Sequence, residues 1–191
     1  MPACDGLELD VRLSADGVPV VHHDDTLERV HGLPARVDAL TAAALGEVGV
    51  PTLADVLASV GRRPFLDVEL KGDPGSAPVE VLTAARGVAL ERTVVSSFDA
   101  SALERVGRLR PSWQLWLNSH TLAATTIAEA LALGCRCVAV DWRVLDRGSV
   151  DLARAAGLEV AAFTVRSRDV YERLARLGVT AICVEDEALD G

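Results

Sequence analysis

The sequence predicts an α/β protein built as a TIM-type (β/α)8 barrel. From Gly87 onward short apolar strands alternate with helices, and glycines at positions 134, 157 and 178 mark helix ends. This regular alternation with short loops is typical of a parallel sheet. Polar side chains stand at the carboxyl ends of at least four predicted strands, and a barrel gathers those ends at one mouth. A doubly wound sheet would gather them at one switch point, and no glycine-rich phosphate loop is present.

Length and composition indicate one globular domain over residues 1–191, with 50% hydrophobic and 25% charged residues. The net charge of −9 without any basic run argues against nucleic acid or an anionic membrane as a partner. No apolar stretch reaches the roughly 18 residues of a membrane span, so we expect no transmembrane segment. The four cysteines lack zinc-type spacing and no signal peptide opens the sequence. We therefore expect free thiols in a reducing, cytoplasmic compartment.

The stretch Gly6–Arg12 is the first predicted strand. Glu8 and Asp10 are two residues apart, so a strand directs both carboxylates to one face and the interleaved aliphatic residues to the other. Two neighbouring carboxylates repel each other, and a hard divalent cation with oxygen ligands is the simplest partner. A solvated face of an ordinary strand explains the same pattern equally well.

The next elements are a hairpin and two helices. Asp16-Gly17 predicts a tight turn into a ribbon at Val18–Val21. A helix is expected from Val37 to Val48. A second helix follows Thr52, which can cap it, and ends at Gly61.

The second barrel strand, Phe65–Lys71, repeats the pattern of the first. Asp67, Glu69 and Lys71 share one face. Lys71 can form an ion pair with Asp67 or Glu69 on this face.

The rest of the chain supplies the remaining strand–helix units. Asp99 is expected to cap a helix through Leu109. Seven barrel strands are counted when the Val18–Val21 ribbon is set aside, whereas a barrel has eight and typically about 250 residues. Further strands are predicted at 93–98, 114–117, 137–141, 159–165 and 181–184, and helices at 79–86, 99–109, 122–133, 150–156 and 169–177.

These motifs together resemble the glycerophosphodiester phosphodiesterase family. Glu-Leu-Asp-Val from Glu8, Asp-Gly-Val-Pro-Val-Val from Asp16 and His-Asp-Asp-Thr-Leu from His23 follow the family pattern almost letter for letter. The resemblance covers essentially the whole chain. It continues through Pro51-Thr52-Leu53, Glu69-Leu70-Lys71, Val95–Phe98, Phe163-Thr164-Val165 (where the family usually has Trp first) and Gly178 to Asp186.

The resemblance implies a metal-dependent hydrolase of lipid and glycerol metabolism, which cleaves glycerophosphodiesters to sn-glycerol 3-phosphate and an alcohol. Glu8, Asp10 and Glu69 would hold Mg²⁺ or Ca²⁺. His23 would be one of two acid–base histidines, and Lys71 would steady the phosphate charge.

Three further residues are candidates for substrate contact together with Lys71. Ser97 lies at a strand end, where a hydroxyl can equally cap the following helix. Trp142 and Phe163 can line the mouth, or pack in the core at strand period.

The family also opens with a strand bearing His-Arg-Gly and a helix begun by Glu-Asn-Thr, and this sequence has neither. We therefore expect that the first β/α unit is missing and that hydrolysis is impaired. An inactive relative that acts as a binding or structural domain, and a phospholipase-like phosphodiesterase, are the alternatives. An open barrel leaves two unpaired sheet edges, so a lost segment or a homo-oligomer is expected to cover them.

Overall fold

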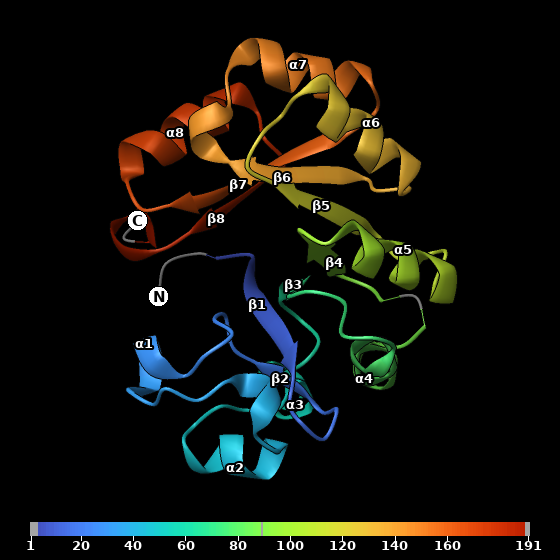
Figure 1. Ribbon diagram of the computed structural model, residues 1–191. Helices are drawn as coiled ribbons and strands as arrows, with labels where there is room; N and C mark the ends of the chain where they lie inside the picture. Colours follow the sequence, from blue (N-terminus) through green and yellow to red (C-terminus); the bar gives the residue numbers. More distant parts are fainter. Residues whose placement is uncertain (1–3, 89, 190–191) are drawn as a thin grey trace. The chain divides into compact units, whose positions relative to one another are not determined.

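A computed structural model describes residues 4–88 and 90–189 (Figure 1). The chain divides into two compact units, an N-terminal unit of Gly6–Trp113 and a C-terminal unit that starts at Gln114. Each unit contains its own run of parallel strands joined by helices.

The sheet of the N-terminal unit has β1 (Gly6–Leu13), β3 (Phe65–Leu70) and β4 (Thr93–Ser97) in parallel and in this order. β2 (Pro19–Val21) pairs antiparallel with β1 on the side away from β3, with Val11 opposite Val21. The predicted ribbon is therefore an excursion beside the parallel strands, as expected.

The register between β1 and β3 places like residues opposite each other. Glu8 lies opposite Asp67, and Asp10 lies opposite Glu69. The aliphatic residues of β3 that alternate with these carboxylates, Leu66, Val68 and Leu70, are buried. Since side chains alternate between the two faces of a strand, all four carboxylates belong to one face of the β1–β3 pair.

The segment between β2 and β3 is less regular than predicted. The prediction of a single helix from Val37 to Val48 is wrong, because the backbone of Leu40 and Thr41 is extended. The Leu40 carbonyl accepts a hydrogen bond from the Ala15 backbone at 2.8 Å, which holds this break. The helical elements here are α1 (Glu28–His31), the 3₁₀ turn η1 (Val37–Ala39), α2 (Ala42–Glu47) and α3 (Leu53–Val60).

Helix caps follow the predicted residues in this unit. Thr52 accepts a hydrogen bond from the Asp55 backbone at 3.1 Å, and Gly61 ends α3. Asp99 caps α5 by accepting from the Ser101 backbone at 2.9 Å. α4 spans Ala77–Arg86 and α5 spans Ala100–Leu109.

The C-terminal unit is a four-stranded parallel sheet with helices α6, α7 and α8 on one side (Figure 1). Gly178 takes a positive φ of 79° after α8, a conformation that glycine adopts at little cost. α7 begins earlier than predicted because Asp146 and Ser149 form a capping box. The elements are β5 (Leu115–Ser119), α6 (Ala124–Ala132), β6 (Cys137–Asp141), η2 (Trp142–Val144), α7 (Arg147–Ala155), β7 (Glu159–Val165), α8 (Arg168–Leu177), β8 (Ala181–Val184) and η3 (Asp186–Leu189).

The cysteines are free thiols, as predicted, and Cys135 and Cys137 are buried at the start of β6. Burial raises the pKa of Cys135 to about 12, so this thiol stays protonated and unreactive. Within residues 4–88 and 90–189, none of the helices combines the length and apolar character that crossing a membrane would need.

Candidate active site

Three carboxylates of the N-terminal unit converge at one place. Glu8, Asp10 and Glu69 each offer an oxygen, and these three atoms lie within 4.8 Å of one another. Glu69 is buried, Asp10 is half-buried and Glu8 is exposed. The two-residue spacing on β1 and the parallel register with β3 bring these side chains together.

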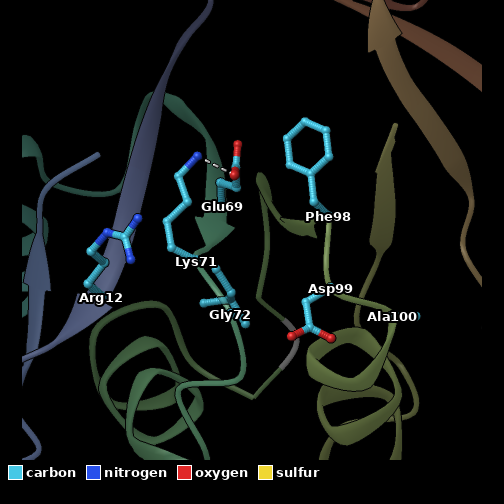
Figure 2. A pocket seen from close by; sticks show the side chains of 8 residues that line it. Arg12, Glu69, Lys71, Gly72, Phe98, Asp99 and Ala100 are labelled. Atoms are coloured by element: carbon cyan, nitrogen blue, oxygen red, sulfur yellow. Dashed lines mark hydrogen bonds and ion pairs between the residues drawn. The ribbon is translucent and has the colours of Figure 1, made fainter. Parts of the chain in front are cut away.

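Lys71 is the cation of this cluster. Its Nζ lies 2.8 Å from Oδ1 of Asp10 and also donates a hydrogen bond to Oε1 of Glu69 (Figure 2). Burial works against its charge, but the hydrogen bonds to Asp10 and Glu69 outweigh this and raise the pKa of Lys71. The ion pair with Glu69 was one of the predicted arrangements, whereas the pair with Asp10 was not foreseen.

Asp67 lies next to the cluster and is held from β4. The hydroxyl of Ser96 donates to Oδ1 of Asp67 at 2.6 Å. Burial raises the pKa of Asp67 to about 7, and the charges of Glu69 and Asp10 act in the same direction. Loss of hydration also raises the pKa values of Glu8 and Glu69. One lysine therefore does not compensate the negative charge gathered on this face.

His23 is exposed and belongs to a chain of three polar residues. Its Nδ1 lies 2.6 Å from Oδ1 of Asp24, and Arg29 donates from Nε to Oδ2 of Asp24 at 2.6 Å. Hydrogen bonds from Arg29 and His23 hold the pKa of Asp24 well below its usual range. An ionised Asp24 can only accept, so Nδ1 of His23 carries the proton and Nε2 is left for chemistry.

Asp24 is a residue that the sequence analysis missed. The Asp24-Asp25 pair has the composition of a turn, and a turn explains it without any partner. The available signal was the acid directly after the candidate histidine. The neighbouring His22 is buried, and its Nε2 lies 3.0 Å from the carbonyl of Thr26, as suits a structural residue.

A pocket of about 490 Å³ opens beside the cluster (Figure 2). Glu69 and Lys71 line it together with Arg12 from β1. The remaining lining residues come from the end of β3 and the start of α5: Leu70, Gly72, Phe98, Asp99 and Ala100.

Three further residues were predicted to contact the substrate. Ser97 is buried, donates to the carbonyl of Leu70 at 2.6 Å and accepts from the backbone of Asp99 at 3.0 Å. Trp142 and Phe163 belong to the C-terminal unit. There the Trp142 ring packs under the guanidinium groups of Arg143 and Arg173. Phe163 meets His120 edge to face. Their contact with substrate stays a prediction.

The donor set fits a hard divalent cation. The three carboxylate oxygens of this small cluster match the oxygen ligands that Mg²⁺ and Ca²⁺ prefer. The raised pKa values of Glu8 and Glu69 show that the negative charge there lacks compensation. Lys71 alone does not balance the negative charge of these carboxylates, and a divalent cation would supply the additional positive charge.

The model of the glycerophosphoryl diester phosphodiesterase family matches residues 3–188. Because this match spans nearly the whole sequence, the chain belongs to that family. It is 24% identical over 200 residues to a glycerophosphodiester phosphodiesterase of Caldanaerobacter subterraneus, with 95% of this chain and 82% of the relative covered.

Solved structures of the family have the same fold. A phosphodiesterase of Oleispira antarctica in complex with the product sn-glycerol-3-phosphate superposes with a TM-score of 0.81 at 26% identity, over 94% of this chain and 81% of its own. A glycerophosphodiester phosphodiesterase of Agrobacterium tumefaciens gives 0.80 at 24% identity, over 97% and 85%. The predicted α/β fold of incomplete TIM-barrel type is thus confirmed, with seven parallel strands in the part that the structure describes.

Proposed function

We propose that this chain hydrolyses glycerophosphodiesters to sn-glycerol 3-phosphate and an alcohol with the help of Mg²⁺ or Ca²⁺. The observation that carries the proposal is the convergence of Glu8, Asp10, Glu69 and Lys71 beside one pocket. Family membership and the Oleispira relative, whose structure holds sn-glycerol-3-phosphate, support the substrate class.

Glu8, Asp10 and Glu69 would hold the metal. When bound, it supplies positive charge that neutralises the phosphoryl oxygens of the substrate. Lys71 adds a second positive charge at the same place, and its ion pairs with Asp10 and Glu69 keep its ammonium group oriented.

His23 is the proposed acid–base residue. Hydrolysis adds a water oxygen to phosphorus, breaks the bond from phosphorus to the alcohol oxygen and needs a proton on the departing alkoxide. Asp24 holds the Nδ1 proton of His23, so Nε2 accepts and releases the proton that moves. Burial raises the pKa of Glu69, and the charge of His23 opposes this rise, which supports a position of the proton carrier near the carboxylates.

The rate is expected to be low. The 191 residues contain no His-Arg-Gly motif, so one of the two histidines of the family pattern has no counterpart in this sequence. The same observation favours a second candidate function, in which the domain binds a glycerophosphodiester without turning it over. A phospholipase-like phosphodiesterase differs in preferring an intact phospholipid.

An assay of alcohol and sn-glycerol 3-phosphate release separates these functions. We expect glycerophosphocholine, with added Mg²⁺ or Ca²⁺, to be hydrolysed faster by the parent than by a Glu8→Gln/Asp10→Asn variant. Equal release by both proteins contradicts the proposed hydrolysis. Faster cleavage of phosphatidylcholine vesicles favours the phospholipase-like alternative. Sedimentation velocity over a range of concentrations tests the proposed homo-oligomer.

A further inference from the structure

β1 and β3 carry the same charge pattern in the same register. Both segments have an acid, an acid and a base at alternate positions: Glu8, Asp10 and Arg12 on β1, and Asp67 and Glu69 on β3 followed by Lys71 directly after it. The pairing of Val11 with Leu70 continues through a 3.0 Å hydrogen bond from the Lys71 backbone to the Val11 carbonyl. The next pair in this register is Arg12 with Lys71, directly beyond the carboxylates.

Arg12 and Lys71 line the same space. Both contribute to the pocket of about 490 Å³ beside Glu69 (Figure 2). Both also line a smaller pocket of about 170 Å³. A ligand in the larger pocket therefore has the acidic cluster on one side and two cationic side chains within reach.

The guanidinium of Arg12 is hydrogen-bonded to a backbone carbonyl and not to a carboxylate. Its polar contact is a 2.9 Å hydrogen bond from Nε to the backbone carbonyl of His23. Within residues 4–88 and 90–189 no ion pair of Arg12 is found. The acids that line the smaller pocket with it are engaged by other arginines: Asp73 is paired with Arg105, and Asp25 and Asp38 are paired with Arg36. Arg36 donates to both oxygens of Asp38, at 2.9 and 2.8 Å, and to Asp25 at 2.9 Å.

Lys71 is in the opposite situation. Its ammonium is already paired with two carboxylates, Asp10 and Glu69, so the charge that it offers to a bound phosphate is shared with them. A phosphodiester in this pocket needs a cation that is not already neutralised, and Arg12 is placed to provide it. A guanidinium also matches two phosphate oxygens in a bidentate contact, which an ammonium does not.

We propose that Arg12 is a phosphate-binding residue of this site, with its terminal N–H groups on the non-bridging oxygens and its Nε on the His23 carbonyl. This inference rests on the proposed function and adds a residue to it. One side chain would then fix both the phosphate and the backbone of the acid–base histidine, and so set the distance between them.

Calorimetric titration of the full chain with sn-glycerol 3-phosphate, with Mg²⁺ in excess, tests the proposal. We expect Arg12→Gln to weaken the affinity by about tenfold or more, because a charge-assisted contact is lost. Arg12→Lys keeps the charge without the contact to His23, and we expect it to recover part of the affinity. Arg108→Gln is the matched control, since it removes an exposed arginine of the same unit that is paired with Glu104, and we expect parent-like binding.

Three outcomes overturn the inference. They are equal affinity of Arg12→Gln and the parent, an Arg12→Lys variant as weak as Arg12→Gln, and no binding by the parent. The second outcome would assign Arg12 to anchoring the His23 backbone alone. Glycerophosphocholine hydrolysis is measured with the same parent sample, so that a failure of the proposed function can be told from a failure of the Arg12 inference. Arg12-dependent binding without hydrolysis contradicts the proposed function but not the inference, and hydrolysis with Arg12-independent binding does the reverse.

Discussion

At the scale of single residues, His23 depends on its neighbour. A histidine that is mostly exposed rotates freely unless something fixes its ring, and Asp24 does so through Nδ1. Arg29 in turn holds Asp24 with two hydrogen bonds, at 2.6 and 3.0 Å. The proposed acid–base role thus belongs to a chain of three residues.

We expect Asp24→Asn to weaken the preference of the His23 ring for the tautomer that is protonated at Nδ1. The amide is a weaker acceptor than the carboxylate, so the ring proton should distribute between Nδ1 and Nε2. Nitrogen-15 NMR of the histidine ring measures this directly, and any hydrolysis should fall about tenfold. Arg29→Gln removes the two hydrogen bonds that hold Asp24 but keeps its carboxylate, so we expect a smaller effect on the ring. An unchanged tautomer in Asp24→Asn would show that Asp24 does not orient the ring.

Glu8 illustrates a conflict between stability and binding. It lies opposite Asp67 on the neighbouring strand, and like charges at such positions destabilise a sheet. We expect Glu8→Gln to raise the free energy of unfolding of the metal-free protein by about 0.5 kcal/mol and to weaken metal binding.

Urea denaturation in the presence of EDTA measures the stability part of this prediction. Glu91→Gln is the matched control, because Glu91 is exposed in a turn outside the cluster. A Glu8→Gln variant that is less stable than the parent in EDTA would mean that the Glu8 carboxylate is already compensated within the protein.

At the scale of elements, an ion pair joins the loop after β3 to α5. Arg105 binds both oxygens of Asp73, at 2.6 to 2.9 Å, and its hydrogen bonds lower the pKa of Asp73 below the usual 3.8. A lowered folded-state pKa means that the stabilisation is present above the unfolded-state value and is lost as the pH falls through the folded-state value.

Asp73→Asn should therefore lose stability in a pH-dependent way. At neutral pH we expect a cost of up to about 1 kcal/mol, since the pair is partly exposed. The difference from the parent should shrink as the pH falls from about 5 to about 3. Denaturation at several pH values measures it. A constant difference over this range would mean that the charge of Asp73 does not contribute.

The elements themselves were largely predictable from the sequence. Strands with period-two alternation and helices opened by Thr52 or Asp99 carry local signals, and the structure follows them. The break at Leu40 and Thr41 was not predictable, because a backbone hydrogen bond from the distant Ala15 holds it. Alanine-rich composition predicted one helix, and tertiary contacts decided otherwise.

At the scale of the whole molecule, the sequence predicted which residues form the candidate site better than how they pair. Family resemblance and strand spacing selected Glu8, Asp10 and Glu69, which lie together. The double ion pair of Lys71 follows from the register of two strands far apart in the sequence. The spacing of residues within one strand does not show which residues of another strand lie beside them. For the same reason the sequence did not predict that Arg12 lines one pocket with Lys71.

The proposed function depends on the binding of a divalent metal by Glu8, Asp10 and Glu69, and calorimetric titration of the full chain with Mg²⁺ and with Ca²⁺ measures this binding. We expect the parent to bind both ions and a Glu8→Ala/Asp10→Ala variant that remains folded by circular dichroism to lose this binding. Unchanged binding by that variant, or no binding of either ion by the parent, would show that these carboxylates do not form a metal site.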